Sequence, residues 1–571
     1  CFISPATVPC HCRSLGEVRT QLMANQEHSL VSFACAIFLV ISTGYASYDV
    51  STCLLFSPAS MSVLNLCSQN WLNHGGDINN RRYCGNETKI SSDTISKMQL
   101  RWKFFAGYDI TATPAIYDGT LYVPTWDGNL FALRASDGAV VWKINLQKLT
   151  GFMPVDFGLQ NVKPTVVSRT TPTATGGKLF ISIYGPAYIV AVGRLTGKLL
   201  WATQLETHNY SLVTMSPTYY KGKLYVGTSS LEEVAPEELC CTFRGSFLQL
   251  NAGNGQILWK TYMLPSNSGK RGFYAGSAIW GSSPSIDVRR NHVYTATGNL
   301  YTVPQSVEEC QKEENSQSIP THPESCLGPD VHANSIVALD INSGNIIWAS
   351  RLGGYDVWLY ACLNQSASFC QVGPNVDADF GASPMTLTVT INGTTTDIVV
   401  AAQKSGFTWA LRRDTGQLAW STKAGPGGLG GGAIWGSASD GRMVYTNIAN
   451  SNRLNFTLLP STAVTTAGGW VGMDARTGRV LWTTGNPRNF TSPGPVTLAN
   501  GILFAGSADP TGTFYAMDGV TGKVMWSFET GASIVGGASV SDGCAFIGTG
   551  RGFFGTRYTS GTSLFAFCVP N

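Results

Sequence analysis

Two adjacent cysteines, Cys240 and Cys241, lie in the stretch EELCCTFRG and could carry redox chemistry. Consecutive Cα atoms across a trans peptide are about 3.8 Å apart, whereas a disulfide usually joins Cα atoms roughly 4.4–6.8 Å apart. A bond between these two sulfurs would therefore distort the peptide and be unusually easy to reduce. The residues alone leave three possibilities: a strained disulfide, two separately paired cysteines, or two free thiols.

The chain has 15 cysteines, which is typical of a protein from an oxidising compartment. Cys310 with Cys326, and Cys362 with Cys370, are candidate bridges within loops. The sequence contains no C-x-x-C-H motif, so we expect no c-type haem in the chain.

The N-terminal residues predict secretion. The first residue is cysteine, and residues 1–22 are interpreted as an untranslated or gene-model extension. Residues 23–47 resemble a signal peptide, because the apolar run 30–42 is shorter than a membrane span and precedes small residues. A buried apolar segment is the alternative. Residues 48–69 are expected to be a linker, and six sequons are compatible with glycosylation, at Asn86, Asn209, Asn364, Asn392, Asn455 and Asn489.

Composition favours a folded chain that has neither nucleic acid nor an anionic membrane as a partner. The 571 residues are 43% hydrophobic and only 13% charged, which excludes disorder by composition. The 38 basic and 35 acidic residues leave a net charge of +3, so no basic surface is indicated. No membrane span is expected in the mature chain.

A repeat runs along most of the sequence. Seven times, an apolar strand is followed by a glycine-containing turn and a second strand ending in tryptophan, at Trp142, Trp201, Trp259, Trp348, Trp420, Trp482 and Trp526. An eighth copy is split between SLFAF at 563–567 and LRW at 100–102. Such a period indicates a repeat architecture, and the split copy predicts that the two ends of the repeat region pair and close a ring.

The shortest repeat shows what each unit is. Its Asp-Gly turns begin at Asp118, Asp127 and Asp137, and Asp-Gly between alternating apolar runs favours hairpins. Each unit is therefore predicted to be a four-stranded antiparallel sheet, and residues 70–571 to form an eight-bladed β-propeller, an all-β fold. The tryptophans are expected to dock blade on blade. Long insertions at 299–335 and 355–380 should lie on a face of the disc, where sites are built.

The motif Ala-x-Asp-x-x-Thr-Gly-x-x-x-Trp resembles the propeller of alcohol dehydrogenases that depend on pyrroloquinoline quinone (PQQ). The stretches CCTFRGS, NWLNHGGDINNRRY and AAQKSGFTWALRRDTG are most similar to the polyvinyl-alcohol-dehydrogenase-like branch, plant members included. The resemblance covers about residues 70–571. It implies a secreted oxidoreductase that oxidises alcohol hydroxyl groups to carbonyls and passes electrons to an external acceptor.

The same resemblance implies a metal site and a general base. Glu232 would ligate Ca²⁺, with Glu233 as a less favoured substitute, and Asn299 would be a second ligand. Asp330 would be both a ligand and the base that takes the hydroxyl proton, with Asp356 as its rival. These groups are oxygen donors, which Ca²⁺ prefers.

The resemblance also implies a quinone site. Trp280 would form the floor under the ring, Lys404 would bond the quinone carbonyl oxygens, and Arg169 would reach the quinone carboxylates. Thr214 would add a polar contact. A bridge between Cys240 and Cys241 near the cofactor is suggested in the same way, and electron transfer would use no haem of this chain.

Each candidate also has a structural alternative. The glutamates could be solvated loop acids, Asn299 a turn cap, Asp330 an Asx-turn residue, Lys404 a surface charge and Trp280 plain core. His74 in NHGGD is interpreted as a structural anchor. The rival hypothesis is accordingly a non-catalytic extracellular propeller whose loops bind a protein or a glycan.

Overall fold

The computed structural model describes residues 70–157, 164–236, 239–317, 325–364, 370, 373, 376–391, 393–552 and 557–570. The predicted extension (1–22), signal peptide (23–47) and linker (48–69) lie outside the described residues. In the part of the chain that is described, no helix is long and apolar enough to cross a membrane.

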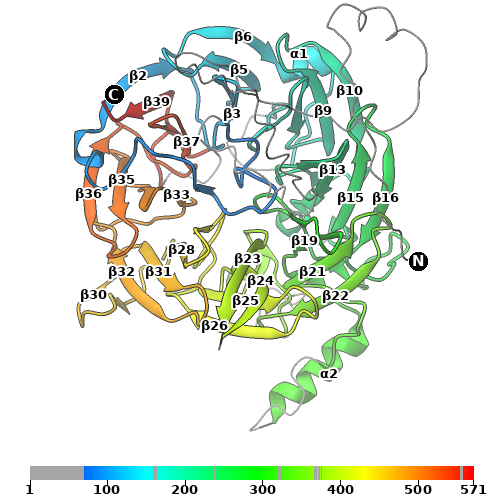
Figure 1. Ribbon diagram of the computed structural model, residues 1–571. Helices are drawn as coiled ribbons and strands as arrows, with labels where there is room; N and C mark the ends of the chain where they lie inside the picture. Colours follow the sequence, from blue (N-terminus) through cyan, green and yellow to red (C-terminus); the bar gives the residue numbers. More distant parts are fainter. Residues whose placement is uncertain are drawn as a thin grey trace, which may run out of the picture. The chain divides into compact units, whose positions relative to one another are not determined.

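The propeller has eight blades, each a four-stranded antiparallel sheet, as predicted (Figure 1). Blade 1 is β3 (Ala115–Tyr117), β4 (Thr120–Pro124), β5 (Asn129–Arg134) and β6 (Val140–Asn145); blade 2 is β7 (Thr173–Ala174), β8 (Lys178–Ser182), β9 (Tyr188–Gly193) and β10 (Leu199–Gln204). Blade 3 is β12 (Thr218–Tyr220), β13 (Lys223–Gly227), β15 (Ser246–Asn251) and β16 (Ile257–Tyr262); blade 4 is β18 (Ser285–Asp287), β19 (His292–Ala296), β21 (Ser335–Asp340) and β22 (Ile346–Arg351).

The remaining blades follow in chain order around the ring. Blade 5 is β23 (Met385–Ile391), β24 (Thr394–Ala402), β25 (Phe407–Arg412) and β26 (Leu418–Lys423); blade 6 is β27 (Ala438–Ser439), β28 (Met443–Ile448), β31 (Gly469–Asp474) and β32 (Val480–Gly485). Blade 7 is β33 (Thr497–Ala499), β34 (Ile502–Gly506), β35 (Thr513–Asp518) and β36 (Val524–Glu529), extended by β1 (Tyr83–Cys84), which runs parallel to β33.

Blade 8 closes the ring with strands from both ends of the repeat region. It contains β37 (Ser539–Ser541), β38 (Cys544–Gly548), β39 (Ser563–Cys568) and β2 (Gln99–Phe105). β2 is antiparallel to β39, with Leu100 opposite Phe567, so the predicted split copy is confirmed. A disulfide joins Cys544 and Cys568 across neighbouring strands of this blade. The pairing with β2 covers the edge of β39 that would otherwise be free.

The tryptophans join each blade to the next, as expected. The indole N–H of Trp142 donates to the carbonyl oxygen of Arg194 (3.0 Å), and that of Trp482 donates to Gly519 (2.9 Å). The turn glycine of the neighbouring blade packs on the indole ring: a Cβ added at Gly522 would lie 2.4 Å from Trp482, and Gly522 has a φ of +72°. The repeat therefore fixes glycine and tryptophan as a contacting pair, because no side chain fits between them.

The segment 71–82, here called the hub, contacts all eight blades (Figure 1, the dark-blue trace within the ring). Backbone bonds tie it to Ile116, Ala174, Ile286, Thr386, Ser439 and Leu498 of blades 1, 2, 4, 5, 6 and 7, and side-chain bonds to Thr218 of blade 3 and to Ala538 beside blade 8. Arg82 is fully buried and donates to four oxygens, including that of His74. His74 is thus part of a structural anchor.

The insertions carry the short elements outside the blades. These are the helices α1 (Leu146–Thr150) and α2 (Gln305–Ser316), the 3₁₀ turns η2 (Ile95–Lys97), η3 (Glu232–Val234) and η5 (Tyr360–Asn364), and the strand pairs β11 (Ser211–Leu212) with β14 (Ser229–Ser230), β17 (Ala275–Gly276) with β20 (Leu300–Thr302), and β29 (Phe456–Thr457) with β30 (Val464–Thr465). The predicted loop disulfides Cys310–Cys326 and Cys362–Cys370 are both present.

Candidate functional site

Lys404 forms two ion pairs just after β24. Its Nζ lies 2.8 Å from Asp377 Oδ1 and 3.0 Å from Asp379 Oδ2, and all three side chains are at most 13% exposed. A backbone hydrogen bond also holds the two segments together, because the Lys404 N–H donates to the carbonyl oxygen of Asp379. A lysine predicted from blade 5 thus meets two acids that come from the end of the 355–380 insertion.

Two further predicted residues converge on Asp379. The indole Nε1–H of Trp280 donates to its Oδ2 (3.2 Å), and the backbone N–H of Asn299 donates to its Oδ1 (2.5 Å). Lys404 Nζ lies 5.2 Å from the centre of a Trp280 ring. We call Lys404, Asp377, Asp379, Trp280 and Asn299 the Lys404 cluster. Asp379 is the centre of this cluster, and sequence reasoning did not select it.

Glycine makes the close packing around Trp280 possible. A Cβ added at Gly381 would lie 2.6 Å from the Trp280 ring, and one added at Gly298 would lie 2.5 Å from Asp379 Oδ1. The stretch Asp-Phe-Gly at 379–381 could have drawn attention to Asp379, because it lies at the end of an insertion that was already expected to build a site.

Three carboxylates share the single ammonium group of Lys404. Burial alone would lower the pKa of Lys404, but Asp377, Asp379 and Glu233 outweigh burial and raise it, so the side chain stays protonated. Burial raises the pKa of Asp377 well above its ordinary range, with Asp379 adding to the effect. Burial, with the charge of Asp379, raises the pKa of Glu233 to about 7. Of the two predicted glutamates, Glu233 is the one whose charge acts on the cluster.

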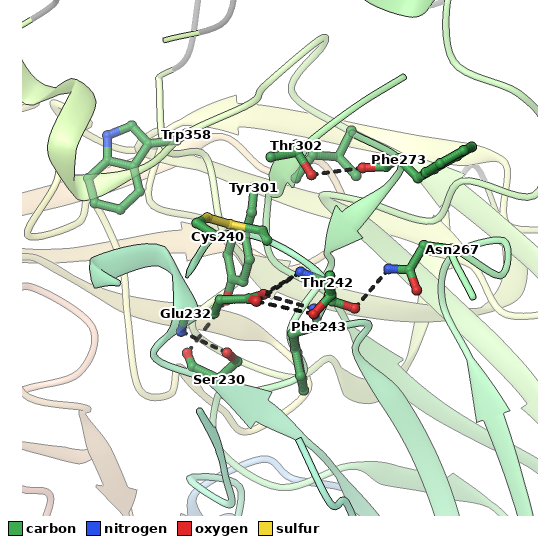
Figure 2. Close-up of a disulfide and its surroundings, with 12 residues drawn as sticks. Ser230, Glu232, Cys240, Thr242, Phe243, Asn267, Phe273, Tyr301, Thr302 and Trp358 are labelled. Atoms are coloured by element: carbon green, nitrogen blue, oxygen red, sulfur yellow. Dashed lines mark hydrogen bonds between the residues drawn. A yellow bond between two sulfur atoms is a disulfide. The ribbon is translucent and has the colours of Figure 1, made fainter. Parts of the chain in front are cut away.

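Glu232 has a different environment. Its carboxylate accepts hydrogen bonds from the backbone N–H groups of Thr242 (2.8 Å) and Phe243 (2.8 Å), drawn in Figure 2, and lies 3.2 Å from Nε2 of His208. The side chain is 1% exposed. We call Glu232, His208, Thr242 and Phe243 the Glu232 anchor. It holds the chain immediately after the two adjacent cysteines.

Cys240 and Cys241 form a disulfide with each other, which resolves the three possibilities that the sequence left open (Figure 2). Cys241 is buried in an apolar cluster with Phe243 and Tyr301, against which Cys240 and Trp280 pack. The disulfide therefore lies in the same apolar cluster as the predicted floor of the quinone site. Its contact with a cofactor stays a prediction.

Arg169 and Thr214 line a cavity that is enclosed by His74 of the hub and by the segments that precede most blades. The Arg169 guanidinium lies 4.4 Å from the ring centre of Trp435 and 5.5 Å from that of Tyr184, and burial lowers its pKa to about 10. Trp435 packs edge-on against Trp280, 5.0 Å away, and Thr214 donates to the Trp280 carbonyl oxygen (2.8 Å). This axial cavity has a volume of about 40 Å³, enough for a few water molecules.

The two predicted bases lie elsewhere. Asp330 is exposed, and its charge acts on His332 rather than on the Lys404 cluster. Asp356 is buried, and it accepts the N–H groups of Asp377 (3.0 Å) and Ala378 (2.7 Å) and the side-chain amide of Asn334. Asp356 therefore holds the backbone that carries Asp377 and Asp379, while Asp330 is not brought to the site.

The three predicted calcium ligands have different surroundings. Glu232 is occupied by N–H donors, Asp330 is exposed, and Asn299 uses its amide N–H₂ on the carbonyl oxygens of Leu300 and Trp358. Within the described ranges, no group of three or more His, Cys, Asp or Glu residues is placed to hold a metal ion. As placed, these residues do not fit a calcium ion. The flat Trp280, the cation of Lys404 and the buried guanidinium of Arg169 do suit an anionic quinone.

Comparisons with known proteins agree with this fold. Residues 95–350 and 467–560 match the PQQ_2 family model, described as outer membrane protein assembly factor BamB. A polyvinylalcohol dehydrogenase of a Pseudomonas species is 29% identical over 492 residues, 81% of this chain and 68% of that protein. Another, from a Sphingopyxis species, is 27% identical over 525 residues, 83% of this chain and 73% of that one.

A solved structure shares the fold. The quinohemoprotein alcohol dehydrogenase ADHIIG from Pseudomonas putida HK5 superposes with a TM-score of 0.66 at 16% identity, covering 90% of this chain and 82% of that one. The family model covers more than half of the chain, so the chain belongs to the PQQ_2 family.

Proposed function

We propose that this protein oxidises alcohol hydroxyl groups to carbonyls, with PQQ bound at the Lys404 cluster and with an external electron acceptor. The observation that carries the proposal is Asp379, whose carboxylate is contacted by Lys404, Trp280 and Asn299. A carboxylate from the 355–380 insertion, the cation of Lys404 and the flat ring of Trp280 thus meet at one place. Such an arrangement is expected of a catalytic site.

The chain offers a set of contacts that suits the quinone. Trp280 would support the ring, Lys404 would hold the quinone oxygens and Arg169 would pair with the carboxylates. The bound quinone would supply the electrophilic carbonyl that accepts the two electrons and the hydrogen of the alcohol. Because the axial cavity is only about 40 Å³, we expect binding to separate Arg169 from Trp435.

Proton transfer falls to Asp379. The negative carboxylate would accept the hydroxyl proton as the carbon–hydrogen bond breaks. Lys404, kept protonated by its acidic neighbours, would stabilise negative charge that develops on oxygen. Asp377 is held close to Lys404 (2.8 Å) and keeps its ammonium group in place.

The names of the relatives suggest the substrate class. Two polyvinylalcohol dehydrogenases cover most of this chain, so we propose secondary hydroxyl groups along a chain as the substrate. Secretion is part of the proposal, and four disulfides in the described residues support it, because they persist in oxidising compartments.

The first experiment is calorimetric titration of the purified protein from residue 23 onward with PQQ, with and without Ca²⁺, alongside dye reduction with primary and secondary alcohols. We expect PQQ binding and turnover that is highest with secondary alcohols. The absence of both binding and turnover in either condition would contradict the proposed function and favour the non-catalytic propeller.

A further inference from the structure

A second, much larger cavity is lined in part by Glu232 of η3. Its volume is about 710 Å³, and six of its lining residues are consecutive, 206–211. We call it the 206–211 cleft. Pockets that bind organic ligands usually measure roughly 300–1,000 Å³, so this cleft has room for several linked units, whereas the axial cavity does not.

The charges in the cleft are mostly compensated. Glu206 forms an ion pair with Lys260 (2.6 Å), which outweighs burial and lowers the pKa of the carboxyl. Glu232 also lines the cleft and is engaged by the N–H groups of its anchor. Lysine and arginine are absent from the described residues that line it. Among the described lining residues, an anionic ligand meets the carboxyl groups of Asp156, Glu206 and Glu232 and neither lysine nor arginine, so a neutral ligand fits this lining better.

The remaining groups suit alternating hydroxyl and hydrocarbon groups. Thr207 and Asn209 are exposed and can donate or accept hydrogen bonds. Gln204 accepts the hydroxyl of Tyr188 with its Oε1, which leaves its N–H₂ as a donor. Pro186 and Leu239 add apolar surface to the same cleft. Such a mixture binds chains whose carbons carry hydroxyl groups.

The cleft and the Lys404 cluster share the 3₁₀ turn η3. Glu232 lines the cleft, whereas the next residue, Glu233, interacts electrostatically with Asp379 and Lys404. Leu239 and Thr242 line the cleft on either side of the Cys240–Cys241 disulfide, against whose cluster Trp280 packs. A chain held in the cleft is therefore next to the segment that borders the proposed site of oxidation.

We propose that the 206–211 cleft binds a neutral chain bearing several hydroxyl groups, so that the units beyond the one being oxidised are held by the protein. The inference rests on the proposed function for its chemistry, but the binding itself can be measured without turnover. The cleft gives the enzyme a preference for oligomers over small alcohols, and it acts on KM rather than on kcat.

The test uses Thr207→Trp, which fills the cleft from an exposed position and keeps the backbone contacts of residue 207. The matched control is Thr415→Trp, at an exposed turn of blade 5 that does not line the cleft. Both proteins are produced in a bacterial host without N-glycosylation, because Asn209 is part of a sequon. Melting temperatures verify that each variant folds.

Steady-state kinetics with PQQ compares a short polyvinyl alcohol oligomer with 2-propanol. We expect Thr207→Trp to raise KM for the oligomer about tenfold, the effect of losing one or two hydrogen bonds, with kcat and the KM for 2-propanol unchanged. The control should match the wild type. Equal changes in KM for the oligomer and for 2-propanol, or no change in either KM, would overturn the inference.

Calorimetric titration without PQQ separates the two proposals. Binding of the oligomer to the wild type and its loss in Thr207→Trp would support the cleft even if no alcohol were oxidised, in which case only the proposed function fails. Turnover of 2-propanol with no oligomer binding would refute the cleft alone. A cello-oligosaccharide titrated in parallel distinguishes a polysaccharide from a polyvinyl chain as the source of the hydroxyl groups.

Discussion

The Glu232 anchor and the Lys404 cluster each bury a carboxylate, and they differ in what those carboxylates contact. Glu232 is bound by backbone N–H groups, with a histidine beside it. Asp379 is bound by a protonated lysine, an indole N–H and one backbone N–H, with two more acids nearby. The first carboxylate is held mainly by backbone N–H groups, which do not titrate, while the second belongs to a group of interacting charges.

This difference separates a structural role from a chemical one. Backbone N–H donors stabilise the ionised form of a carboxylate and fix a loop to it. Where several buried acids share one cation, their negative charges interact and can shift their pKa values. Groups with shifted pKa values are expected at catalytic sites. The resemblance pointed to Glu232 for metal chemistry, and the contacts assign it to holding the disulfide segment.

The largest expected effect is on the chemistry at Asp379. Asp379→Asn keeps the size of the side chain and removes its capacity to take a proton. We expect kcat for alcohol oxidation to fall about 10²- to 10⁴-fold, the usual contribution of a general base, measured by dye reduction with saturating PQQ. Asp330→Asn is the control and should retain wild-type kcat; the reverse result would return the base to Asp330.

The next effect is on stability. Lys404→Met removes the cation and leaves Asp377 and Asp379 buried without it, and breaking a buried pair in this way costs about 3–5 kcal/mol. Urea unfolding at pH 8 should show that loss. Lys423→Met, at an exposed position of β26, should change the free energy of unfolding little. An equal effect of both variants would mean that the Lys404 ion pairs do not stabilise the fold.

Glu232→Gln should have a smaller effect. The amide is similar in size, but it weakens the hydrogen bonds from Thr242 and Phe243 because the charge is lost, which we expect to cost about 1–3 kcal/mol. Chemical unfolding measures this cost, and kcat per folded molecule should stay near the wild-type value. A large fall in kcat with unchanged stability would instead give Glu232 a role in the reaction.

The blades could be predicted from the sequence because their signals are local. An Asp-Gly turn needs positive φ, and a turn glycine and a tryptophan recur in the seven unsplit repeats. The strands, the turn and the docking contact of each such repeat are therefore encoded within a few residues. Trp280, Lys404 and Asn299 were found by resemblance. Their roles stay predictions, although the fold does bring them together.

Asp379 could not be selected in the same way. It is 99 residues from Trp280, 80 from Asn299 and 25 from Lys404 in sequence, and it lies in an insertion that has no counterpart in the repeat. The sequence around Glu232 likewise does not show that the backbone N–H groups of residues 242 and 243 donate hydrogen bonds to its carboxylate. Both facts depend on how the insertions fold back over the blades.

The smallest effect concerns Glu233, and it is a dependence on pH. The ordinary pKa of a glutamate is 4.5, and burial raises that of Glu233 to about 7 in the folded protein. Below pH 4.5 the side chain is protonated in both states and costs nothing. Between pH 4.5 and 7 only the unfolded chain loses the proton, so the free energy of unfolding falls as the pH rises, and above pH 7 the loss is complete.

Glu233→Gln removes this dependence. The variant should therefore gain stability relative to the wild type as the pH rises from 5 to 8, by on the order of 1 kcal/mol or more, measured by unfolding at each pH. Glu232→Gln is the matched control, because its neighbours are N–H donors, and it should be less stable than the wild type at pH 8. If the two variants behaved alike, the contrast between anchor and cluster would be lost, since adjacent glutamates would then share one environment.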